Sequence, residues 1–145
     1  MSKRVFTTFL ACLLVLSISL SLAGCGGSDP KGVVNAFFDS IDKHDAKKFL
    51  NCFEEDVQES FEDIYEEDDL KDMLESIDEL LEDEYGKKWR KEVKVTDVEK
   101  GDKEDDITYY TVTVEMDDEE EEMEVMKIKG KYYISDDAMS GFGGF

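Results

Sequence analysis

The apolar residues of this 145-residue chain change their spacing near its middle. Between Val33 and Leu81 they recur every three or four residues, which is the spacing of amphipathic helices. From Val93 onward they alternate with polar residues, most clearly in ITYYTVTVEM at 107–116, which is the spacing of strands. The connections between these strands are short, so neighbouring strands must pair antiparallel. The sequence therefore predicts an α+β fold, with N-terminal helices packed on one face of a four-stranded antiparallel sheet.

Local signals indicate where the helices begin. Pro30 suits the first turn of a helix, and Asp45 can cap a second one. Residues 57–65 continue the helical spacing through an acidic stretch, and Asp68 or Asp69 can cap a longer helix after it. The acids of these helices fall mostly opposite the apolar stripe, which predicts a solvated face rather than a site.

The strands are separated by polar stretches that we interpret as turns, at 100–106, 117–120 and 130–131. Alternation within 107–116 assigns its side chains to two faces. One face carries Tyr110, Val112, Val114 and Met116, and the other carries Ile107, Tyr109, Thr111 and Thr113.

The N-terminus has the layout of a secretory signal. Lys3 and Arg4 precede an uncharged run from Val5 to Leu22, and small residues follow it. The stretch LAGC at 22–25 resembles the lipobox of bacterial lipoproteins at every position. The resemblance implies a signal peptide over residues 1–24, a diacylglyceryl thioether on Cys25 and an extracytoplasmic protein anchored in the cell membrane by that lipid. The alternative is an uncleaved N-terminal span, which eighteen residues could form.

Residues 25–30 are expected to be a flexible tether, residues 31–136 the folded domain and residues 137–145, rich in Gly and Phe, a disordered tail. The alternative for the tail is that it folds back over the sheet or into a pocket. The net charge is −21, and it becomes two units more negative when Lys3 and Arg4 leave with the signal. A surface this acidic repels nucleic acid and anionic lipid head groups, so we expect neither as a partner.

Cysteine, histidine and acid patterns give no strong signal for a cofactor or metal. Cys12 leaves with the signal and Cys25 is modified, so Cys52 has no partner for a disulfide, and with His44 it makes no zinc site. We interpret Cys52 as a small buried residue, with an exposed thiol as the alternative. The acidic runs lack the loop that converges oxygens on calcium. We therefore expect no cofactor and no metal site.

The domain also resembles a known family. An aromatic-rich stretch, VVNAFFDSIDKHDAKKFLNCF, a long amphipathic helix, and the strands ending in GKYYISD are together similar to bacterial lipoproteins with a domain like nuclear transport factor 2, also called cystatin-like or SnoaL-like. The resemblance implies a curved, cone-like sheet with a pocket at its wide end. Candidate pocket-lining residues are Phe37, Phe38, Ile41, Trp89, Tyr110 and Val112.

Relatives with this cone include isomerases and dehydratases, whose general base needs an apolar cavity. Here Asp39 and Asp42 are interpreted as surface residues, and His44 as a solvated turn residue. We therefore expect no enzyme and name no catalytic residue. The expected function is binding of a small apolar ligand or a protein of the cell envelope. A pocket enzyme and a purely structural envelope lipoprotein are the alternatives.

Overall fold

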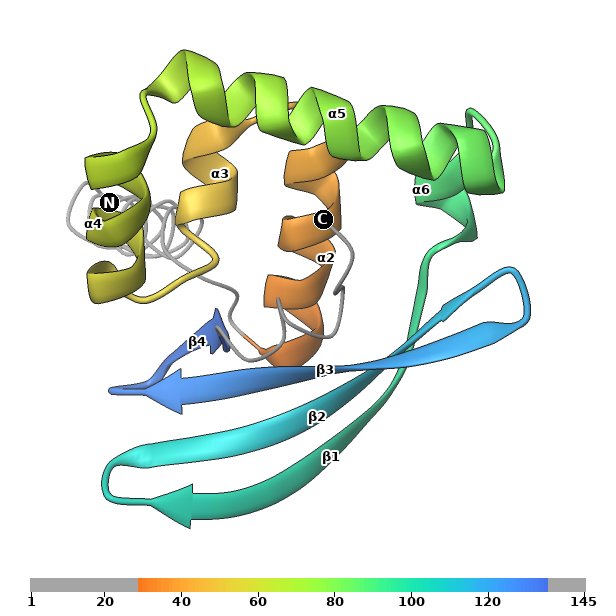
Figure 1. The fold of residues 1–145 in the computed structure, drawn as a ribbon. Coiled ribbons are helices and arrows are strands. Elements are labelled where there is room, and N and C mark those ends of the chain that lie inside the picture. The colour runs from red at the N-terminus through yellow and green to blue at the C-terminus, as the bar shows by residue number, and fades with distance from the viewer. Residues whose placement is uncertain (1–28, 136–145) are drawn as a thin grey trace, which may run out of the picture.

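The computed structural model describes residues 29–135, which form helices followed by an antiparallel sheet (Figure 1). The signal peptide, residues 25–28 of the expected tether with Cys25, and the tail lie outside these residues, whereas Asp29 and Pro30 at the end of the expected tether form the start of α2. Within 29–135, no helix is both long and apolar enough to cross a bilayer. The helices are α2 (Pro30–Asp42), α3 (Ala46–Leu50), α4 (Glu55–Ile64), α5 (Glu67–Tyr85) and α6 (Trp89–Glu92).

Side-chain caps explain where the helices begin. The Asp29 carboxylate accepts a hydrogen bond from the Gly32 amide at the start of α2, where Pro30 occupies the first turn. Asp45 Oδ1 accepts from the Lys48 amide at 3.0 Å, which confirms its predicted role as the cap of α3. The predicted cap of α5 is wrong, because the helix begins at Glu67. Asp69 lies inside the first turn, and its Oδ2 accepts from the Glu66 amide at 3.1 Å.

The sheet has the strand order β1-β2-β3-β4, every neighbouring pair is antiparallel, and it is open rather than closed. The strands are β1 (Lys94–Glu104), β2 (Ile107–Met116), β3 (Glu119–Ile128) and β4 (Lys131–Ile134). The turns have two residues each, at 105–106, 117–118 and 129–130, so the first two are shorter than predicted and the third begins one residue earlier. Positive φ angles at Asp105, Asp117, Asp118, Lys129 and Gly130 give these hairpins the tight backbone that a two-residue loop needs.

The α2 helix lies between the sheet and α5, and every labelled helix lies on one side of the sheet (Figure 1). Val112, Val114 and Met116 of β2 are buried toward the helices, as the alternation predicts, and Tyr110 is half-buried beside them. They form one hydrophobic core with the apolar faces of α2, α3 and α5. The opposite face of the sheet carries no helix or strand of residues 29–135.

Candidate binding surface

The residues predicted to line a pocket lie in the hydrophobic core. Phe37, Phe38, Ile41, Trp89 and Val112 are each at most 4% exposed, and Tyr110 packs against them from the edge of the core. The Phe37 ring lies 5.4 Å from Phe38 and 5.8 Å from Phe49 between ring centroids. None of these six residues lines either of two surface cavities, of about 360 and 230 Å³, found among the described residues. A pocket at these positions therefore stays a prediction.

A buried carboxylate joins three elements of the helical layer. Asp78 of α5 is 9% exposed, and its Oδ1 accepts a hydrogen bond of 2.7 Å from Trp89 Nε1. Its Oδ2 lies 2.7 Å from Nε2 of His44, which sits in the turn after α2 with φ 52°. Both oxygens of the carboxylate are thus paired, which a buried charge requires. We name His44, Asp78 and Trp89 the Asp78 latch.

Sequence reasoning missed this latch. It described His44 as solvated, whereas the imidazole is only about one-third exposed and is hydrogen-bonded to Asp78. A signal was present, because Asp78 occurs four residues after Leu74 and three before Leu81, on the apolar stripe of α5. An acid at such a position needs a buried partner. With both oxygens engaged, the carboxylate holds the helices together.

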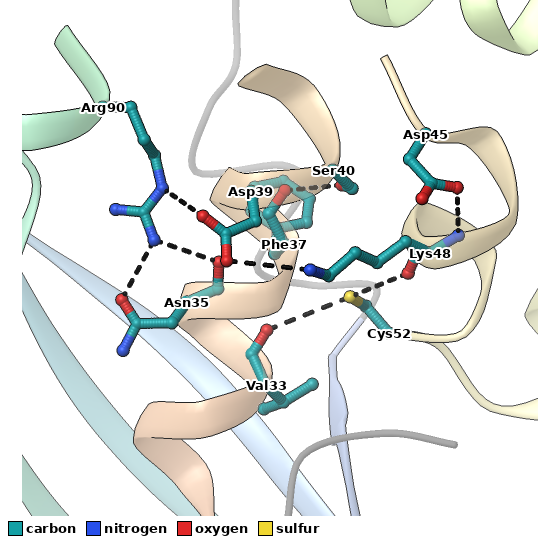
Figure 2. A network of polar contacts seen from close by, with 9 residues as sticks. All are labelled: Val33, Asn35, Phe37, Asp39, Ser40, Asp45, Lys48, Cys52 and Arg90. Carbon is teal, nitrogen blue, oxygen red and sulfur yellow. Dashed lines mark hydrogen bonds and ion pairs between the residues drawn. The ribbon is translucent and has the colours of Figure 1, made fainter. Parts of the chain in front are cut away.

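Figure 2 shows a second polar network, formed around Asp39 of α2. Arg90 Nε donates to Asp39 Oδ1 at 2.8 Å, and its Nη2 donates to the carbonyl and side-chain oxygens of Asn35 at 3.3 Å. Lys48 Nζ lies 3.7 Å from the other oxygen of Asp39. Asp39 was interpreted as a surface residue, and it is instead one-third exposed and paired with two cations. This network fastens α6 and α3 to α2.

Cys52 lies on the same side of the core (Figure 2). Its side chain is 1% exposed, which confirms the interpretation as a buried residue. Burial raises the pKa of the thiol to about 12, and Sγ lies 3.3 Å from the Lys48 carbonyl. The Cys52 carbonyl accepts from the Ile134 amide at 2.7 Å, which ties the end of α3 to β4.

The helix-free face of the sheet lies outside the hydrophobic core and carries apolar side chains of its own. Residues directly opposite each other in antiparallel strands point to the same face. The pairs Tyr109–Met126 and Met126–Tyr133 form one row there, and Ile107 pairs with Ile128 in the next. Met126 is only 7% exposed although it faces away from the helices, and the others are half-buried. We name this set the outer apolar cluster: Ile107, Tyr109, Met126, Ile128 and Tyr133.

Acidic side chains predominate over the rest of that face, where they share the rows with Thr111, Thr113 and Lys94. Glu99 and Glu124 flank Thr111 in the row beside the outer apolar cluster. Two further rows follow along the same strands, so the face changes from apolar to acidic over its length. We name the acids of these rows the acidic rows: Asp97, Glu99, Glu115, Glu120, Glu122 and Glu124.

The two surface cavities lie beside α4. One, of about 360 Å³, is lined by acids of the α4 N-terminus and by the β3–β4 hairpin. Its hairpin residues include Ile128 and Tyr133, so this end of the outer apolar cluster borders the start of α4 at the sheet edge. The other, of about 230 Å³, is a groove with Leu50, Tyr65 and Leu70 among its lining residues. Ile64, next to that groove, is 72% exposed.

Within residues 29–135, no three His, Cys, Asp or Glu side chains are grouped so that they could hold a metal ion.

Comparison of the chain with protein-family models, with curated proteins and with solved structures gave no match.

Proposed function

We propose that this chain is a non-catalytic binding domain, anchored by lipid on the extracytoplasmic side of a cell membrane, whose helix-free sheet face binds a protein partner. The main observation that supports this proposal is the outer apolar cluster on that face. Apolar and aromatic side chains gathered outside a core are characteristic of surfaces that bind other molecules. The helices bury the other face of the same sheet, so the rigid core holds this surface in place.

The proposed anchor supports a binding role at the membrane. Two acyl chains on Cys25 would suffice for stable anchoring, since each buried methylene contributes about 0.8 kcal/mol. The folded part then needs no membrane-binding surface of its own. Its net negative charge would repel anionic head groups and keep the domain clear of the bilayer.

A small apolar ligand is the second candidate, in keeping with the cone-like family that the sequence resembles. The groove at Leu50, Tyr65 and Leu70 favours it, because these side chains line a space of about 230 Å³, with the charged Lys47, Glu62 and Glu67 also among its lining residues. The sheet face is the stronger candidate, since its apolar residues come from three strands held in fixed register.

We expect Cys25→Ser to release the protein from membranes or to leave an unprocessed precursor, because serine cannot form the thioether. Fractionation of cells, with the mass of the N-terminal fragment, measures this. Cys52→Ser is the matched control and should stay in the membrane fraction if it folds. Normal processing and membrane retention of the Cys25 variant would show that the anchor is wrong.

Site-specific photo-crosslinking in intact cells tests partner binding. We expect a cross-linker at position 133 or 111, both on the helix-free face, to give one discrete adduct with a second protein. A cross-linker at position 75, on the exposed side of α5, is the control and should give none. Equal labelling from all three positions, or labelling from position 75 alone, would contradict a binding role for the sheet face.

A further inference from the structure

The helix-free face is apolar toward one end and acidic along the rest of its length. This distribution limits the kinds of molecule that can bind to it. The outer apolar cluster lies at one end, nearest the β3–β4 turn, where Glu104 and Lys131 complete the row of Ile107 and Ile128. The acidic rows occupy the remaining length. Along β3, Ile128 and Glu120 mark the two ends. They are eight residues apart, which is about 27 Å in a strand.

The acidic rows carry charge that the domain leaves unpaired. None of the ion pairs among residues 29–135 involves these six acids. Lys94, opposite Glu115, is the base that shares their rows. Acids this close on one face repel each other, so a cationic partner would relieve that repulsion on binding.

The negative charges of the acidic rows also disfavour other molecules that could bind to this face. A second copy of this face would bring two sets of acidic rows together, which costs free energy through like-charge repulsion. An anionic membrane or a nucleic acid would be repelled for the same reason. Charge complementarity therefore selects a cationic occupant, and the outer apolar cluster requires that it also carry apolar side chains.

We infer that the partner presents a basic polypeptide segment with an apolar end, and that the segment lies along the strands with its apolar end on the outer apolar cluster and its Lys or Arg residues over the acidic rows. This inference rests on the proposed function, since it names the chemistry of the partner for the same face. An extended segment of about eight residues spans the distance. Apolar anchoring supplies most of the affinity, and the charges supply orientation and rate of association.

The test uses a labelled peptide of about ten residues, apolar in one half and lysine-rich in the other, offered in both chain directions. Its binding to the protein, extracted with a non-ionic detergent, is measured by fluorescence anisotropy against empty micelles. We expect binding that weakens as salt rises. Tyr133→Ser should weaken it about tenfold, and the double variant Glu122→Gln/Glu124→Gln about fivefold.

Matched variants on the helical side separate this site from general attraction to an acidic protein. Tyr65→Ser removes a tyrosine from the α4–α5 connection, and Glu75→Gln/Glu79→Gln removes two exposed acids from α5. Neither should change the affinity by more than about twofold. Melting temperatures of all variants show which are folded, and the Glu122→Gln/Glu124→Gln variant keeps the test valid if Tyr133→Ser fails to fold.

Three outcomes would overturn the inference: equal weakening by the helical-side variants, equal binding of a peptide with glutamate in place of lysine, or equal binding of a peptide of the same composition with the two residue types interspersed. If cross-linking from position 133 succeeds while the lysine peptide does not bind, the charge inference fails and the proposed function stands. If cross-linking from the sheet face fails, the proposed function itself is wrong.

Discussion

We expect Phe37→Ala to lower the free energy of unfolding by about 3–5 kcal/mol, the range found when a large buried side chain is truncated. The Phe37 side chain is 4% exposed, and its ring lies within 6.4 Å of three other phenylalanine rings between centroids. It belongs to α2, the helix between the sheet and α5, so the cavity left by truncation is enclosed and cannot easily collapse. Urea unfolding of both proteins measures the loss.

The measured loss of unfolding free energy also distinguishes a densely packed core from a ligand pocket at Phe37. Ile64→Ala is the control, because Ile64 is 72% exposed and its truncation should cost less than about 0.5 kcal/mol. If Phe37 lined an open pocket, truncation would remove few contacts and cost far less. A loss below about 1 kcal/mol for Phe37→Ala would therefore contradict dense packing and favour a ligand pocket at the predicted positions.

We expect the second largest effect at the Asp78 latch. Asp78→Ala should lower the free energy of unfolding by about 2–4 kcal/mol, because it leaves the indole N–H of Trp89 buried without an acceptor. Trp89 is fully buried, so water cannot replace the lost partner. The half-exposed His44 retains access to water, and His44→Ala should cost about 1 kcal/mol.

A double-mutant cycle isolates the Asp78–Trp89 hydrogen bond. Trp89→Phe keeps most of the buried ring but removes the donor, and the double variant Asp78→Ala/Trp89→Phe should cost about 1.5–3 kcal/mol less than the sum of the two single changes. Asp83→Ala, an exposed acid on the same helix, corrects for the general relief of charge repulsion. Strict additivity of the two changes would show that the latch contributes nothing to stability.

Individual helices and strands could be predicted from the sequence because their signals come from residues that are close together in the chain. Apolar spacing located the helices, and Asp45 was identified as a cap because the cap and the amide it binds are three residues apart. The inward set on β2 followed from alternation alone. Two of the three turns were predicted too long, since a polar stretch such as 100–104 resembles a loop in composition but continues β1 through backbone pairing with β2.

Only part of the proposed binding surface could be predicted from the sequence. Alternation assigned Ile107 and Tyr109 to the face opposite Val112, but their meeting with Met126 and Tyr133 depends on the register of two hairpins. A shift of one residue in either hairpin would turn those side chains toward the helices. The two-residue turns set that register, and composition placed the turns incorrectly.

The sequence by itself determined the type and order of the elements, the α+β class and the excess of negative charge, because each is a property of neighbouring residues or of composition. Tertiary structure decided which charges are buried and paired, as for Asp78 with Trp89 and His44, and that Phe37 packs among three other rings. It also decided that apolar and acidic residues share one open face. The physical reason is that burial and pairing arise from contacts between residues far apart in the chain, and local spacing carries no record of those distances.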